Sequence, residues 1–162
     1  MACVYLGIGS NVDSRRNIRL AIGWLQEQFL DAAFSPVYQS PSVGFDGDDF
    51  LNLVARVQTH MTPLELKHLL NKFEDKHGRI RDVPKFSDRT VDIDILLYDE
   101  CVLNDAGMVL PRREITRFAH VLKPLADIAP DLLHPVEEES ISDLWRAFPK
   151  TDLELTRLEN FS

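Results

Sequence analysis

The chain has 162 residues, of which 44% are hydrophobic and 27% charged, and its formal net charge is −8 at pH 7. These values predict a single globular domain over residues 1–162 that is large enough for a proper core. The acidic balance argues against a general binder of nucleic acid or of anionic membranes, because proteins of both kinds carry an excess of basic residues. A local basic pocket for a small anion remains compatible with it.

The two cysteines also bear on where the protein works. Cys3 and Cys101 lie in apolar stretches and do not form a Cys-x-x-Cys pair. We therefore expect reduced, buried thiols and a cytoplasmic location. No apolar run approaches the roughly 18 residues of a membrane helix, and no signal peptide precedes the first strand-like segment, so we expect no membrane partner.

Strand and helix patterns alternate in the first sixty residues. Alternating polarity predicts strands, and apolar residues at helical spacing predict the helix between them. In chain order we expect a strand at 4–8, a helix from about 13 to 29, and strands at 32–38 and 50–59. Gly7 and Gly9 leave bare positions in the first strand, which indicates close packing there.

The middle of the chain contains the clearest helix start. Thr62 can cap the helix, Pro63 suits its first turn, and Glu65 can close a capping box. Gly78 is placed to end this helix. The polar stretches on either side of these elements, 39–49 and 80–88, read as long loops of the kind that carries function or moves.

The remaining pattern completes an α+β fold. We expect a strand at 90–98 continuing into a short hairpin, an apolar run at 108–110, helical turns within 112–122 and 124–129, a capped helix at 140–148 and a frayed tail. The order predicts a ferredoxin-like βαββαβ sandwich with a mainly antiparallel sheet and C-terminal helical additions. Helices on one face would leave the other face free to hold something.

Two carboxylates share one face of the strand predicted at 90–98. Val91, Ile93 and Ile95 alternate with Asp92 and Asp94, and neighbouring carboxylates on one face repel each other unless something neutralises them. Water on an outer strand face is the ordinary remedy. A magnesium ion beside substrate phosphates is the functional one.

Three arginines precede this carboxylate pair. Arg79, Arg81 and Arg89 could bind phosphates, and phosphoryl transfer needs metal ions, positive side chains and mobile cover that excludes water. The alternative is a solvated helix end, in which Glu74, Arg79 and Arg81 form exposed ion pairs of little energetic value.

Several longer motifs occur in a specific order. They are Tyr5-Leu6-Gly7-Ile8-Gly9-Ser10-Asn11, Tyr38-Gln39-Ser40-Pro41, Asp49-Phe50-Leu51-Asn52, Gly78-Arg79-Ile80-Arg81, Asp88-Arg89-Thr90-Val91-Asp92-Ile93-Asp94-Ile95-Leu96, Leu110-Pro111, and Val121 through Pro130. With these motifs the sequence resembles the 6-hydroxymethyl-7,8-dihydropterin pyrophosphokinase family of folate biosynthesis over nearly its whole length.

The resemblance implies a reaction and a set of site residues. The β- and γ-phosphates of ATP would move together onto the hydroxymethyl oxygen of the reduced pterin, and a monomer would use ATP as co-substrate with two Mg²⁺ ions. It assigns catalysis to Arg79, Arg89, Asp92 and Asp94, with the two aspartates as metal ligands; ATP binding to Glu74, Arg81, Arg112 and Arg117; and pterin binding to Ser40, Val43, Phe50, Asn52 and His120.

The chain departs from the family pattern at a few of these places. Ser87-Asp88 replaces Gly-Pro, Arg112 stands for a histidine, Phe118 for an arginine, and His120 for a phenylalanine that stacks on the pterin. We therefore expect a divergent pyrophosphokinase. The alternatives are a paralogue that binds a pterin or nucleotide with little turnover, and a plain ferredoxin-like interaction domain.

Overall fold

The structure, a computed structural model, describes residues 1–42, 47–77, 90–105, 107–151, 153–159 and 161. Its strands are β1 (Ala2–Ser10), β2 (Ala33–Phe34), β3 (Tyr38–Ser40), β4 (Phe50–Thr59), β5 (Asp92–Tyr98), β6 (Leu103–Asp105), β7 (Met108–Leu110) and β8 (Thr156–Arg157). Its helices are α1 (Ser14–Gln28), α2 (Pro63–Lys76), α3 (Glu114–Arg117), α4 (Ala119–Ile128) and α5 (Ile141–Ala147).

One antiparallel sheet forms the centre of the molecule, with spatial order β5-β1-β4-β3-β8, and β2 pairs with β4 beside β3. If β2 and β3 are counted as one interrupted strand, the order of the first four strands is fourth, first, third, second. This is the strand order of a ferredoxin-like βαββαβ sandwich. The predicted α+β fold is therefore confirmed.

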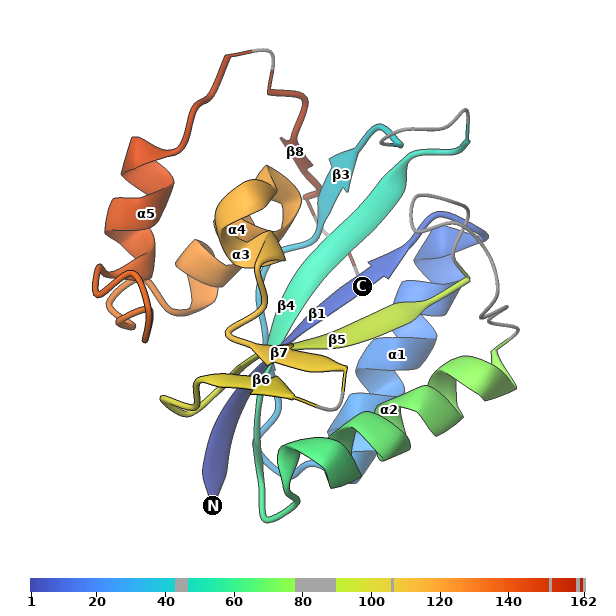
Figure 1. The fold of residues 1–162 in the computed structure, drawn as a ribbon. Helices are drawn as coiled ribbons and strands as arrows, with labels where there is room; N and C mark the ends of the chain where they lie inside the picture. Colours follow the sequence, from blue (N-terminus) through green and yellow to red (C-terminus); the bar gives the residue numbers. More distant parts are fainter. Residues whose placement is uncertain (43–46, 78–89, 106, 152, 160, 162) are drawn as a thin grey trace.

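The first face of the sheet packs against α1 and α2 (Figure 1). Up to the last residue of each strand, every second residue of β1 and β4 is apolar and turns to this side, as the alternation in the sequence predicts. The helices contribute matching apolar stripes, and α2 begins with the predicted capping box, in which Glu65 N–H donates to Thr62 Oγ1 at 3.2 Å and Thr62 N–H donates to Glu65 Oε1 at 3.0 Å. The buried side chains here include Val4, Leu6, Ile8, Ile18, Leu25, Leu53, Val57, Leu66 and Leu70.

The second face of the sheet is partly covered, whereas the sequence pattern predicted that it would be free. The helices α3, α4 and α5 cover part of it (Figure 1), and a separate apolar cluster joins them to Tyr5, Val54 and Leu96. The C-terminal additions carry an apolar stripe of their own, which must be buried somewhere. Because their turns read as short and separate, the sequence does not reveal that they dock on the sheet.

Two further local expectations near this region were wrong. The strand β5 does not continue into a hairpin; β6 pairs instead with β7 in a small separate sheet. Pro124 does not begin a new helix but lies inside α4, which runs through it.

The tail after Pro149 does not simply fray. Residues 156–157 form β8 and pair with β3, and Leu158 N–H donates to Val37 O at 2.9 Å. Phe161 lies beneath the guanidinium groups of Arg15 and Arg19, at 5.5 and 5.2 Å from its ring centre. An open sheet edge offers backbone hydrogen bonds to any extended segment, whatever its composition, which explains why a charged tail can be ordered.

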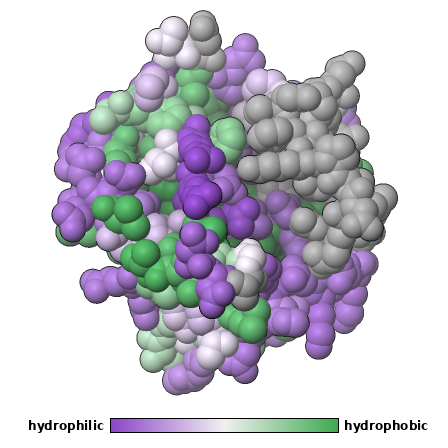
Figure 2. Space-filling view, viewed as in Figure 1, coloured by the Kyte–Doolittle hydropathy of each residue, from purple (hydrophilic) through white to green (hydrophobic). Residues whose placement is uncertain are grey.

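The surface that faces the viewer in Figure 1 mixes hydrophobic and hydrophilic residues, as Figure 2 shows for the atoms that are not grey. Among the described residues, no helix is long and apolar enough to span a membrane.

Candidate active site

The two aspartates of β5 point to the second face of the sheet. Asp92 and Asp94 are half-buried, whereas Ile93 and Ile95 between and after them belong to the core on the α1 and α2 side. In the pairing with β1, Asp92 lies opposite Gly9 and Asp94 lies opposite Gly7. Because neither glycine carries a side chain, the carboxylates have no cross-strand neighbour on β1 to neutralise or cover them.

Asn52 lies in the same row of the sheet, one strand further on. Gly9 pairs with Asp92 on one side and with Asn52 on the other, so the Cα atoms of Asp92 and Asn52 are about 10 Å apart by ordinary strand spacing. A Cβ on Gly9 would come within 2.7 Å of Asn52 Nδ2, so the Asn52 amide lies across the bare backbone of Gly9. This contact explains the glycine in the first motif.

The Asn52 side chain also carries an unused acceptor. Its Oδ1 is buried and finds no hydrogen-bond donor in the described part of the chain. Most buried polar atoms in folded proteins are paired, and one that is left over costs stability. An unpaired amide oxygen at this place therefore points to a ligand that donates a hydrogen bond to it.

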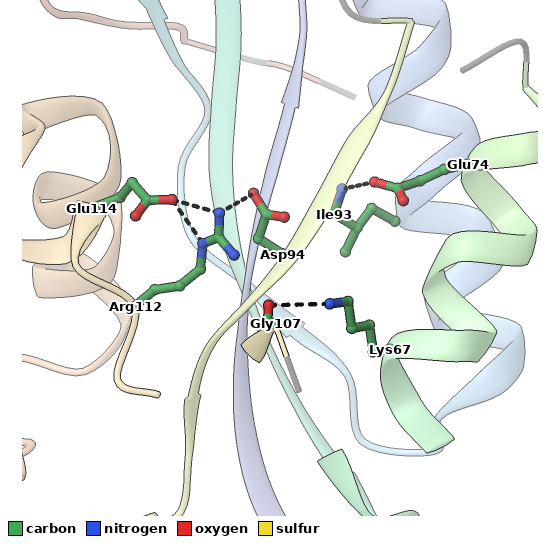
Figure 3. Close-up of polar contacts among 7 residues, drawn as sticks. All are labelled: Lys67, Glu74, Ile93, Asp94, Gly107, Arg112 and Glu114. Atoms are coloured by element: carbon green, nitrogen blue, oxygen red, sulfur yellow. Dashed lines mark hydrogen bonds and ion pairs between the residues drawn. The ribbon is translucent and has the colours of Figure 1, made fainter. Parts of the chain in front are cut away.

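A short ionic network lies beside Asp94 (Figure 3). Arg112 Nε donates to Glu114 Oε2 at 2.8 Å, its Nη2 forms an ion pair with the same oxygen at 2.6 Å, and Nη2 lies 3.9 Å from Asp94 Oδ2. The backbone fixes the position of this arginine, since Arg112 N–H donates to Leu96 O at 2.9 Å. Burial lowers the pKa of Arg112, but the carboxylates of Asp94, Glu114 and Asp92 more than offset this and raise it above its usual value. The guanidinium is a permanent positive charge at the edge of the carboxylate pair.

Glu74 supports β5 from the opposite side, as Figure 3 shows. It is almost fully buried near the end of α2, and its Oε2 accepts a hydrogen bond of 2.9 Å from Ile93 N–H. The acceptor therefore fixes the strand at the residue between Asp92 and Asp94. The predicted contact of Glu74 with ATP remains a prediction.

His120 and Phe118 form an aromatic pair at the start of α4. Their ring centres are 5.2 Å apart and the rings are nearly parallel. Burial lowers the pKa of His120 to about 4, with Glu114 opposing the change. The imidazole is therefore neutral near pH 7 and can stack on a flat heterocycle much as the expected phenylalanine would.

The other predicted site residues fall into two groups. In the described part, Ser40 ends β3 opposite Phe50 of β4, both are half-buried, and Arg117 is exposed at the end of α3. Val43, Arg79, Arg81 and Arg89 lie outside the described residues, as does Ser87-Asp88.

Sequence reasoning missed two contacts on this face. The first is the contact of Glu114 with Arg112: Glu114 lies two residues after Arg112 and belongs to none of the motifs named above. The hydroxyl of Tyr38 donates to Asp127, whose other oxygen accepts from Lys123 Nζ at 2.8 Å. The bond between Tyr38 and Asp127 joins β3 to α4. Both residues lie inside motifs named above, but only the fold reveals that they are in contact.

The donor set suits a hard divalent cation. Asp92 and Asp94 offer carboxylate oxygens, which are the ligands that Mg²⁺ prefers. Among the described residues, no group of three or more His, Cys, Asp or Glu side chains gathers in a way that could hold a metal ion. A site of two carboxylates fits an ion that takes its other ligands from water and substrate phosphates.

Together, these features define a ferredoxin-like α+β protein with a carboxylate pair, a guanidinium and an unpaired amide on one face of its sheet. A sequence profile of the family described as 7,8-dihydro-6-hydroxymethylpterin-pyrophosphokinase (HPPK) matches residues 5–130. The chain belongs to this family, which confirms the resemblance seen in the sequence.

Individual relatives agree with this assignment. The chain is 36% identical over 155 residues to the 2-amino-4-hydroxy-6-hydroxymethyldihydropteridine pyrophosphokinase of Pseudomonas aeruginosa, covering 93% of this chain and 94% of that protein. It is 34% identical over 145 residues to the protein of the same name from Aquifex aeolicus, covering 88% and 90%. Against the folic acid synthesis protein fol1 of Schizosaccharomyces pombe the identity is 31% over 157 residues, and the chain spans 21% of that protein's length and 93% of its own.

A solved structure supports the fold. Plasmodium falciparum HPPK-DHPS superimposes with a TM-score of 0.74 over 96% of this chain and 48% of that one, at 12% identity. The chain thus spans about half of that protein.

Proposed function

We propose that this protein transfers the pyrophosphoryl group of ATP to the hydroxymethyl oxygen of 6-hydroxymethyl-7,8-dihydropterin, in folate biosynthesis. One observation carries the proposal: the row Asp92–Gly9–Asn52, in which a carboxylate and an unpaired amide share one sheet face with only a glycine between them. The carboxylates suit metal-bound phosphates and the amide suits the edge of a heterocycle. The names of the relatives support the same reaction.

In this reaction the hydroxymethyl oxygen attacks the β-phosphorus of ATP and loses its proton. The bond between the β-phosphorus and the oxygen bridging to the α-phosphate breaks, and AMP leaves with that electron pair. Asp92 and Asp94 would hold Mg²⁺, which when bound neutralises the phosphates and lowers the pKa of the attacking hydroxyl. We propose two such ions, with Asp92 and Asp94 as the residues that would hold them.

The chain's own groups orient the two substrates. Arg112 offers a charged fork that can pair with phosphate oxygens, and we assign Arg117, Arg81 and Glu74 to the ATP side with it. Arg79 and Arg89 are proposed as the catalytic arginines.

On the pterin side, the Asn52 amide would read the heterocycle edge. The neutral ring of His120 and the ring of Phe50 would contact its faces, and Ser40 and Val43 would contribute backbone groups. The helix α4, which carries His120, is held to β3 by the bond between Tyr38 and Asp127.

The finer parts of the proposal concern assembly and location. We propose a cytoplasmic monomer that acts on small molecules and has neither a nucleic-acid nor a membrane partner. The net charge of −8 supports the exclusion of anionic polymers and anionic membranes.

The proposal is tested by measuring AMP in a reaction that contains the protein, ATP, Mg²⁺ and the hydroxymethyl pterin. We expect AMP release that depends on the pterin and stops when the metal is chelated. The same protein should be stabilised thermally by Mg²⁺-ATP, by about 2.7 kcal/mol at 100 times the dissociation constant. Thermal stabilisation without AMP release would instead indicate a paralogue that binds its ligand with little turnover. The absence of both signals would indicate an interaction domain.

A further inference from the structure

We infer that Glu114 is a positioning residue for the metal site: it holds the Arg112 guanidinium and thereby keeps the Asp94 carboxylate available to a divalent cation. The inference rests on the proposed function, since it assumes that Asp94 is a metal ligand. It assigns a role to a residue that no motif marks and to an arginine that departs from the family pattern.

The first step of the argument is geometric. Arg112 Nη2 lies 2.6 Å from Glu114 Oε2 and 3.9 Å from Asp94 Oδ2, so the same nitrogen forms a close ion pair with one carboxylate and a longer one with the other. Its Nε donates to the same Glu114 oxygen at 2.8 Å. A hydrogen bond and a close ion pair therefore hold the arginine to Glu114, while Asp94 receives an ion pair at longer range.

The second step concerns burial and charge. About a third of each of the Arg112 and Asp94 side chains is exposed, at 35% and 36%, and Glu114 is more buried at 21%. In such a setting the attraction between opposite charges is only partly screened by water. If Glu114 lost its charge, Asp94 would be the remaining ion-pair partner of the guanidinium among the described residues, and the guanidinium could close the gap to it.

The third step is competition. A guanidinium in direct contact with Asp94 would use the lone pairs that a cation needs and would repel that cation. The histidine expected at position 112 could be neutral and would present no such obstacle. The arginine is a permanent charge, so it needs a restraint, and Glu114 supplies one.

The test is a metal-binding measurement without ATP or pterin, using titration calorimetry with Mg²⁺ and electron paramagnetic resonance of Mn²⁺. We expect Glu114→Gln to weaken cation binding about five- to tenfold and Arg112→Gln to strengthen it by a similar factor. The matched control is Arg113→Gln. This variant removes a positive charge from the neighbouring residue, whose side chain is exposed, and its affinity for the cation should be close to that of the wild type.

The double variant Arg112→Gln/Glu114→Gln decides between two causes. If Glu114 acts by holding Arg112, it has no effect once Arg112 is gone, and the double variant matches Arg112→Gln. If Glu114 merely adds negative charge near the metal, its removal weakens binding by the same factor in both backgrounds, and the inference is overturned. A loss of thermal stability in Glu114→Gln with unchanged metal affinity would show a purely structural role and overturn it as well.

A reference variant separates this inference from the proposed function. Asp94→Asn should weaken cation binding more than Glu114→Gln does. If it has no effect, Asp94 is not a metal ligand and both proposals lose that ligand. If Asp94→Asn weakens binding but Glu114→Gln binds as the wild type does, only the inference fails.

Discussion

The two faces of the central sheet are made by the same strands but have different contents. Toward α1 and α2, most buried side chains of β1, β4 and β5 are apolar, with Ser10 and Thr59 at strand ends as polar exceptions. Toward α3–α5, the face holds apolar residues such as Val54 and Leu96 together with the polar residues Asp92, Asp94 and Asn52. The first face supplies most of the burial that stabilises the fold, and the second combines partial burial with the candidate chemistry.

The difference teaches that the side to which a strand residue points decides what its replacement does. Neighbouring residues on β5 belong to opposite faces, so Ile93 serves the core and Asp94 the site. The second face carries two carboxylates on one side of a strand and a buried unpaired oxygen, both of which reduce stability. Such costs are typical of functional sites and are offset by the packing of the first face.

The largest effect should come from the second face, at Asp94. Asp94→Asn keeps the shape of the side chain but removes a charged metal ligand, so we expect turnover to fall at least about 100-fold. The free energy of unfolding should stay within about 1 kcal/mol of the wild type, because repulsion from Asp92 is relieved while the pairing with Arg112 is lost. AMP release and chemical denaturation measure the two quantities.

Asp131→Asn is the control for this change, since Asp131 is exposed in the segment after α4 and should have no effect on either measurement. Full activity of Asp94→Asn in magnesium would remove Asp94 from the site.

The next effect should come from the first face and have the opposite character. Leu25 is fully buried on α1, and Leu25→Ala should reduce the free energy of unfolding by about 3 kcal/mol, through lost burial and a cavity. The activity per folded molecule should not change at a temperature where the variant is folded. The comparison fails if this variant keeps its stability or loses its turnover number.

The matched control is Leu20→Ala on the same helix. Leu20 is 40% exposed, so its truncation should change stability by no more than about 0.5 kcal/mol.

These two faces also differ in how far the sequence alone could predict them. The first face follows from local patterns, because the alternation in β4 and the capping box of Thr62 and Glu65 depend on neighbours in the chain. The placement of Asp92 and Asp94 on one face of β5 follows from the same alternation. Local signals were sufficient wherever one element determines its own inward side.

What could not be predicted depends on contacts between distant segments. The register that places Asn52 across Gly9, the docking of α4 on the second face, and the pairing of β8 with β3 all join residues far apart in the sequence. The link between Arg112, Glu114 and Asp94 is of the same kind. No period in the sequence encodes these contacts, because they arise only after the sheet has formed.

A smaller effect should follow from replacing Asn52 with a side chain of the same branched shape. Asn52→Leu removes the unpaired Oδ1, so stability should stay the same or rise by up to about 1 kcal/mol. The affinity for the pterin should fall about 10- to 100-fold, because the amide that reads the ring edge is gone. Calorimetric titration with the pterin and thermal unfolding give the two values.

Asn17→Leu provides the contrast to this variant. Asn17 is also buried, but its Nδ2 donates to Val12 O at 2.6 Å, so the same substitution should reduce stability and leave pterin affinity unchanged. If Asn52→Leu destabilises the protein as Asn17→Leu does, the amide of Asn52 has a structural partner after all.

The smallest effect should show that a polar group on the second face can be structural. The hydroxyl of Tyr38 donates to Asp127, and Tyr38→Phe should lower the free energy of unfolding by only about 1.5 kcal/mol at pH 8, since Asp127 retains its bond to Lys123.

Burial, and then the bond to Asp127, raises the pKa of Tyr38. A group whose pKa is raised by folding contributes stability below its unfolded pKa, about 10, and that stability is lost as the pH rises toward the folded value. Denaturation between pH 8 and 11 should therefore show the wild type losing stability faster than Tyr38→Phe above pH 10. Parallel curves would mean that the hydroxyl titrates as it does in the unfolded chain and that the bond to Asp127 does not hold α4 to β3.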